Sequence, residues 1–279
     1  MWRPLQRPSN TEISTTFQGL RSRREGALVA YLTGGDPNPR EFLQNAAALA
    51  EGGADIIEIG IPFSDPIADG PVIQASSQRA LVSGATPRSV LGLTRQLSHS
   101  YPRIPLVLLT YYNPILAMGL DKFMEKAHES GASGTVVPDL PVEESNDYRK
   151  AALKHEVDTV FLTAPNTSKH RLEKIVGQTT GFLYLVSLFG VTGPRESLSQ
   201  TALSSVKRLK DVSRNTPAVA GFGISKPEHV SALMHSGADG AIVGSALVRL
   251  VSENLDSSNS TQDLLRQRVS ELKRATRMG

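Results

Sequence analysis

The chain contains no cysteine and no long hydrophobic segment. Without cysteine it can form no disulfide, no thiolate nucleophile and no cysteine-ligated metal centre. None of its apolar runs approaches the ~20 residues that a membrane-spanning helix needs. The first ten residues, MWRPLQRPSN, lack the apolar core of a secretory signal. We therefore expect a cytoplasmic protein with no membrane contact.

The chain also lacks a strong excess of one charge, since it has 30 basic and 27 acidic residues and a net charge of +3. The basic excess lies at the ends, with five Arg against two Glu in residues 1–26. A nucleic-acid-binding protein usually carries a basic stripe on its folded body. The distribution instead indicates solvated basic termini, and no nucleic-acid partner is expected.

Eight short apolar runs alternate with amphipathic segments from residue 27 onward. Nearly continuous apolar runs are typical of parallel strands that are buried on both faces. Eight strand–helix units in 279 residues predict one α/β domain folded as a single (β/α)8 TIM barrel. We expect a disordered arm over residues 1–12, a barrel over residues 13–279, and a last barrel helix over residues 262–275. The expected strands are 27–33, 55–60, 105–111, 134–139, 158–163, 182–187, 217–221 and 239–244.

Two carboxylates stand out near the end of the second expected strand. Glu58 lies inside the apolar run IIEIG, where a carboxylate is costly to bury unless it is paired or used. The loop PFSDPIADGP (62–71) then brings Asp69 to the same end of the barrel, where active sites of this fold are built. Taken singly, Glu58 could be a core residue with a hidden partner, and Asp69 a turn former. Together they suit acid–base catalysis, because one environment is dry and the other wetter.

Glycine-rich segments follow the last three expected strands: LFGVTGP (188–194), GFGIS (221–225) and VGSALV (243–248). TIM barrels often bind phosphate at this place, through backbone amides and the start of a short helix. A single motif of this kind could be an ordinary tight turn. Three at successive strand ends predict a phosphate site.

Lysine and histidine are missing from the expected strand ends. All ten lysines and all six histidines fall in helical patterns or at their starts. A Schiff-base aldolase would place a lysine at a strand end, and a metal-dependent barrel would place histidines there. No dinucleotide fingerprint occurs either. The pattern disfavours these three classes of site.

Several motifs carry a resemblance to one family. They include YLTGGDP (31–37), GADIIEIGIPFSDPIADGPVIQ (53–74), TYYNPI (110–115), VPDLPVEES (137–145), FGVTG (189–193) and GFGIS with GADGAIVGSALV. In this order they resemble the tryptophan synthase alpha-subunit family from about residue 14 to about residue 251. The resemblance implies a carbon–carbon lyase that splits indole-3-glycerol phosphate into indole and D-glyceraldehyde 3-phosphate for tryptophan biosynthesis.

The resemblance also implies roles for individual residues. Glu58 is similar to the group that shuttles a proton at indole C3, and Asp69 to the group that contacts the indole N–H. Thr192 is similar to a lid residue whose hydroxyl reaches Asp69 when the lid closes. The remaining matches are Gly193, Gly223, Gly244 and Ser245 in the phosphate cradle, Tyr184 beside the catalytic glutamate, and Tyr31, Ile73, Leu109 and Phe222 in the walls around the ring.

The family implies a separate pyridoxal-phosphate beta subunit as partner, in an alpha2beta2 heterotetramer, with no metal or organic cofactor in this chain. The loop at 62–70, Asn113–Pro114 and Pro141 resemble the docking surface. Alternatives remain open: an indole-glycerol-phosphate synthase or a sugar-phosphate epimerase among other phosphate-binding barrels, a free-standing indole-releasing lyase, and a non-catalytic activator of a beta subunit.

Overall fold

Eight parallel strands pair in sequence order, and β8 pairs back to β1, which closes a barrel. The computed structural model describes residues 11–186, 198, 200–213, 215–221 and 223–278. The predicted (β/α)8 fold is confirmed. β1 and β5 have the predicted bounds, whereas β4 begins and ends earlier than predicted, and its register against β3 shifts at Leu106/Val107. The strands are β1 (Ala27–Thr33), β2 (Ile56–Gly60), β3 (Leu106–Leu109), β4 (Ala132–Val136), β5 (Asp158–Thr163), β6 (Leu183–Val186), β7 (Ala218–Gly221) and β8 (Gly240–Val243).

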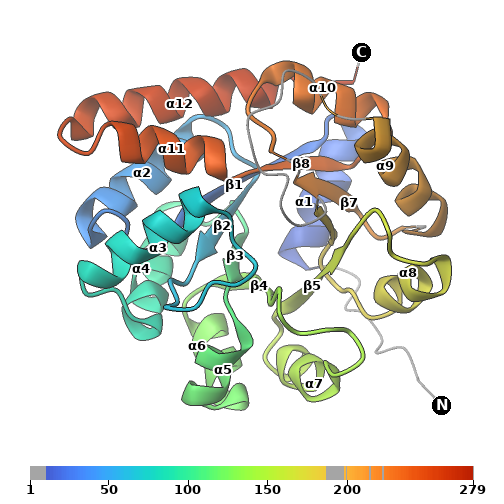
Figure 1. The fold of residues 1–279 in the computed structure, drawn as a ribbon, viewed down its shortest axis with the longest axis horizontal. Helices are drawn as coiled ribbons and strands as arrows, with labels where there is room; N and C mark the ends of the chain where they lie inside the picture. The colour runs from blue at the N-terminus through green and yellow to red at the C-terminus, as the bar shows by residue number, and fades with distance from the viewer. Residues whose placement is uncertain (1–10, 187–197, 199, 214, 222, 279) are drawn as a thin grey trace.

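Helices surround the strands on the outside, as Figure 1 shows. Among the described residues none of them is long and apolar enough to cross a bilayer. The last, α12, packs against α2, as expected for the helix that completes the ring. The helices are α1 (Glu12–Ser22), α2 (Pro39–Glu51), α3 (Pro71–Val82), α4 (Pro87–Ser100), α5 (Tyr112–Met118), α6 (Leu120–Glu129), α7 (Asn146–Lys154), α8 (Lys169–Val176), α9 (Gln200–Ser213), α10 (Pro227–His235), α11 (Ser245–Glu253) and α12 (Ser258–Arg274).

Successive residues of each strand point alternately into the barrel and out toward the helices. On β2, Ile57 and Ile59 belong to the outer core between strands and helices, whereas Ile56 belongs to the core inside the barrel. Glu58 therefore shares the inward face of β2 with Ile56. This alternation is what aims a carboxylate into an apolar interior.

Helix α1 closes one end of the barrel and was not foreseen from the sequence. Its residues Ile13, Phe17 and Leu20 pack against inward-facing strand residues, and the Phe17 and Phe182 rings lie 6.0 Å apart. In Figure 1 the helix lies within the outline of the strand ring rather than in the outer layer. Thr11 and Glu12, expected in the N-terminal arm, instead cap and begin this helix. Residues 1–10 of that arm lie outside the described residues.

Glycine occupies the last inward positions at the opposite, C-terminal end of three strands or just beyond them. These are Gly60 on β2, Gly221 on β7 and Gly244 after β8. A Cβ on Gly60 would collide with the Tyr31 hydroxyl, and one on Gly221 would come within 3.0 Å of the Tyr184 ring. The missing side chains at Gly60 and Gly221 make room for the rings of Tyr31 and Tyr184, while α1 fills the other end.

We expect Phe17→Ala to lower the free energy of unfolding by about 3–5 kcal/mol, because it opens a cavity in a packed apolar core. Urea unfolding followed by circular dichroism would measure the change. Val82→Ala is the matched control, since the Val82 side chain is 79% exposed and should shift stability by no more than about 0.5 kcal/mol. Equal effects of the two substitutions would show that α1 does not contribute to the stability of the barrel.

Candidate active site

A cavity of about 300 Å³ opens at the C-terminal end of the barrel. This volume suits a small organic ligand. Thr192, Gly193 and Phe222, also predicted from the sequence, lie outside the described residues. The cavity brings together the other nine predicted site residues: Tyr31, Glu58, Asp69, Ile73, Leu109, Tyr184, Gly223, Gly244 and Ser245.

The side chain of Glu58 is fully buried, and neither carboxylate oxygen has a hydrogen-bond partner among the described residues. Burial raises the pKa of Glu58 to about 8, with a smaller contribution from the negative charge of Asp69. Loss of hydration disfavours the ionised form of a carboxyl group, and a neighbouring anion adds to the effect. At neutral pH Glu58 is therefore mostly protonated and able to donate a proton into the cavity.

Asp69 differs because it is partly exposed and hydrogen-bonded. The Tyr111 hydroxyl donates to Asp69 Oδ2 at 3.0 Å and accepts from the Ala68 amide at 2.9 Å. Burial raises the pKa of Asp69 to about 6, and the hydrogen bond from Tyr111 opposes that rise. At neutral pH Asp69 is therefore mostly ionised. The two carboxyl groups of the cavity thus carry different charges, because Glu58 is fully buried whereas Asp69 is partly exposed and hydrogen-bonded.

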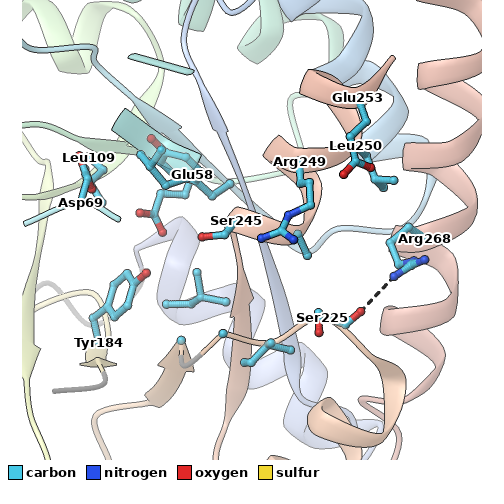
Figure 2. Close-up of a pocket in the computed structure, with 18 residues that line it drawn as sticks. Glu58, Asp69, Leu109, Tyr184, Ser225, Ser245, Arg249, Leu250, Glu253 and Arg268 are labelled. Carbon is cyan, nitrogen blue, oxygen red and sulfur yellow. Dashed lines mark hydrogen bonds between the residues drawn. The ribbon is translucent and has the colours of Figure 1, made fainter. Parts of the chain in front are cut away.

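Two tyrosines flank Glu58. Tyr31 is its direct neighbour across the β1–β2 pairing, and Figure 2 shows the Tyr184 hydroxyl directed toward the glutamate from β6. The Tyr31 hydroxyl lies 3.2 Å from Thr33 Oγ1, which lies 2.6 Å from Ser76 Oγ on α3. This buried chain of hydroxyl groups fixes the ring of Tyr31 and ties α3 to the barrel.

The opposite end of the cavity includes backbone and small side chains as well as longer side chains from α11 and α12. Ser245 begins α11, and no side chain of the described residues caps the first amide groups of this helix, a place where anions often bind. Gly223 has a φ of +57°, a conformation that favours glycine. A Cβ on Gly244 would approach no atom closer than 3.5 Å, so protein packing does not require glycine there. The open space at Gly244 is available to a ligand.

The comparisons with known proteins agree with this geometry. The family model described as "Tryptophan synthase alpha chain" matches residues 17–277. The tryptophan synthase alpha chain of Methanosarcina barkeri is 44% identical over 265 residues, covering 95% of this chain and 98% of that one.

This chain belongs to the tryptophan synthase alpha-chain family.

Other members of the family are similarly close. The alpha chain of Arabidopsis thaliana is 41% identical over 263 residues, which cover 93% of this chain and 94% of that one. Tryptophan synthase from Mycobacterium tuberculosis superposes with a TM-score of 0.88 at 34% identity, covering 96% of this chain and 99% of that chain. A chain of the tryptophan synthase complex from Pyrococcus furiosus has a TM-score of 0.81 at 41% identity, with 89% and 98% covered.

Tyr111, Arg249 and Arg268 are among the residues of the site that were missed from the sequence. Tyr111 follows β3 in the motif TYYNPI and holds Asp69, but only the fold brings the two together. Arg249 and Arg268 line the cavity beside Ser245. Arg249 could have been found, because it lies four residues after Ser245 and therefore on the same face of the helix.

The described residues contain no group of three or more His, Asp or Glu placed to hold a metal ion. None of the described lysines lines the cavity. The chemistry offered by the described side chains is therefore proton transfer between carboxyl groups, with hydroxyl groups and arginines to position a ligand.

The raised pKa of Glu58 makes stability depend on pH. Between its ordinary value of 4.5 and the folded-state value of about 8, the folded protein keeps a proton that the unfolded chain has lost. Stability therefore falls as pH rises through this window. Glu58→Gln removes this dependence, so its stability relative to wild type should increase by roughly 3–5 kcal/mol between pH 5 and pH 9.

Thermal unfolding at several pH values would measure this trend. The change with pH is the quantity to compare, because the new amide has its own constant effect on stability. Glu173→Gln makes the same substitution at an exposed site on α8 and serves as the control. If Glu58→Gln and Glu173→Gln follow the same pH dependence, the Glu58 carboxyl group does not titrate abnormally.

Proposed function

We propose that this chain cleaves indole-3-glycerol phosphate to indole and D-glyceraldehyde 3-phosphate through Glu58 and Asp69. The observation that supports these roles most strongly is the buried carboxyl group of Glu58, protonated at neutral pH, in one cavity with an ionised Asp69. An enzyme that performs acid–base chemistry at pH 7 needs two groups whose environments separate their pKa values in this way.

The reaction begins when Glu58 donates its proton to C3 of the indole ring, while ionised Asp69 accepts a hydrogen bond from the ring N–H. Protonation makes the ring an electron acceptor, so the electrons of the bond between C3 and the side chain return to the ring. The hydroxyl group on the departing carbon becomes the aldehyde and loses its proton to the Glu58 carboxylate. Glu58 regains its starting state, and the reaction consumes no water or electrons.

The rest of the cavity fits the remaining parts of this substrate. Ile73, Leu109, Tyr31 and Tyr184 provide flat apolar walls around the ring, while Gly223, Gly244 and Ser245 bind the phosphate. The predicted roles of Phe222 at the ring, Gly193 at the phosphate and Thr192 as the lid contact remain proposals.

The family relationship implies a beta-subunit partner, and contacts link the loops beside Asp69 to one another. Phe63 packs on Tyr111 with ring centroids 5.5 Å apart, and the Tyr112 amide donates to Asp139 at 2.9 Å. Ile67 in the same loop is 77% exposed. We propose that this face, with Asn113–Pro114 and Pro141, docks a pyridoxal-phosphate beta subunit in an alpha2beta2 complex in the cytoplasm, with no cofactor in this chain.

Indole release from indole-3-glycerol phosphate, with and without a beta subunit, tests the proposal. Wild type should release indole, and the beta subunit should increase the rate. Glu58→Gln keeps the shape but removes the proton, so turnover should fall at least ~100-fold. Binding of indole-3-propanol phosphate should persist. A wild type that activates the beta subunit without cleaving the substrate would identify a non-catalytic activator, and near-normal turnover of Glu58→Gln would exclude Glu58 as the acid.

The pH dependence of kcat/KM should be bell-shaped, with limbs near pH 6 and pH 8. Activity rises as Asp69 ionises and falls as Glu58 loses its proton. Tyr111→Phe removes the hydrogen bond that lowers the pKa of Asp69, so the acidic limb should move to higher pH. The second ionisation of the substrate phosphate also lies near pH 6, but it is identical for every variant and cancels in this comparison.

Tyr112→Phe is the matched control, because it removes a neighbouring hydroxyl group that makes no hydrogen bond to Asp69. Its profile should coincide with that of the wild type. If the acidic limb of Tyr111→Phe stays at the wild-type pH, the ionisation of Asp69 does not set that limb. If the kcat/KM of the wild type keeps rising above pH 8, the reaction does not need a protonated Glu58.

A further inference from the structure

The two ends of the cavity carry different side chains. Glu58 and Asp69 occupy one end, whereas Arg249 and Arg268, together with Glu253, line the other. Figure 2 shows the two ends on opposite sides of Ser245, with the guanidinium group of Arg249 beside Ser245 and that of Arg268 farther out. A substrate with a neutral ring and an anionic group matches this arrangement, because its charge then lies away from Glu58 and Asp69.

Arg249 is placed on the cavity by the second turn of α11. Ser245 begins the helix, and residues four positions apart on a helix lie one turn apart on the same face. The backbone amides at the start of α11 and the Arg249 side chain are therefore presented to the same space. Arg249 is exposed, and its guanidinium group makes no hydrogen bond or ion pair with the described residues.

The neighbouring arginines Arg266 and Arg268, unlike Arg249, form hydrogen bonds and ion pairs. Arg268 donates to the Ser225 carbonyl oxygen at 3.0 Å and lies 3.5 Å from a Glu271 oxygen, so its donors hold the loop after β7. Arg266 is paired with Glu51 at 2.7 Å. Within the described part of the chain, Arg249 is thus the cavity-lining cation whose charge is not engaged by another side chain.

A backbone cradle by itself supplies little charge for a phosphate group. A helix N-terminus is equivalent to about half a positive charge, whereas a phosphate monoester carries about −1.5 to −2 at pH 7. The planar guanidinium group offers a full charge and donors whose geometry matches phosphate oxygens. The arrangement at α11 therefore lacks one full positive charge that Arg249 is placed to provide.

We propose that Arg249 binds the phosphate group of the substrate with its side chain and makes the site selective for phosphorylated ligands. This rests on the proposed function, of which it specifies one further residue. Glu253 lines the cavity one turn farther along α11, away from Ser245 in Figure 2. The negative charge of Glu253 opposes binding of a phosphate group. The solvent exposure of Arg249 also limits the affinity that its charge can add, because exposed charges are screened by water and salt.

The test compares two ligands that differ only in the phosphate: indole-3-propanol phosphate and indole-3-propanol. Calorimetric titration of Arg249→Gln should show a Kd about 5- to 20-fold higher for the phosphorylated ligand, the scale of a partly exposed charged hydrogen bond. The Kd for the alcohol should stay within about twofold of wild type. For indole-3-glycerol phosphate, KM should rise by a similar factor while kcat changes little.

Arg274→Gln removes the same charge at an exposed position on α12 away from the cavity, and should bind both ligands as wild type does. Unchanged affinity of Arg249→Gln for the phosphorylated ligand would overturn the proposal. So would an equal loss for both ligands, because the residue would then act on the shape of the cavity. Failure of the proposed function has a different signature, since wild type would then not cleave indole-3-glycerol phosphate.

Discussion

The burial of one carboxyl group inside an apolar barrel is the constraint on which the rest of the structure depends. Glu58 points into the same interior as Ile56 and has no hydrogen-bond partner among the described residues. Such a group is stable only when it keeps its proton, and that is the state a general acid needs at neutral pH. The cost in stability and the catalytic capacity have the same physical origin, namely the loss of water around the carboxyl group.

The barrel can meet this cost because its two ends are built differently. At one end, the apolar side chains of α1 pack against the strand interior and contribute to the stability of the fold. At the other end, Gly60 makes room for the Tyr31 ring, and Gly221, Gly223 and Gly244 line the cavity in which Glu58 can meet a ligand. A hydroxyl chain from Tyr31 through Thr33 to Ser76 holds the wall of that space. Stability and function are thus separated along the barrel axis.

The second carboxyl group connects the cavity to the outer surface. Tyr111 binds Asp69 and the Ala68 amide through one hydroxyl group and packs against Phe63 through its ring. A contact that moves the loop at 62–70 would therefore move Asp69 and change its hydrogen bonding. Because that hydrogen bond opposes the rise in the pKa of Asp69, a partner on this face has a direct physical route to the charge of the site.

The sequence by itself determined the barrel, because buried parallel strands appear as local apolar runs and each run can be recognised without its neighbours. It also indicated Glu58, since a carboxylate in such a run is conspicuous, and the glycine-rich ends of the last strands. Helix α1 was missed because its role depends on contacts with strands far along the chain, such as that of Phe17 with Phe182.

Only the tertiary structure showed that Tyr111 controls Asp69 and that Arg249 has no partner among the described residues. Residues 42 positions apart meet through the closure of the barrel, and whether an arginine is paired depends on the packing of helices around it. Local patterns decide which residues face the cavity. The charge that each of those residues carries there is decided by burial and by long-range neighbours.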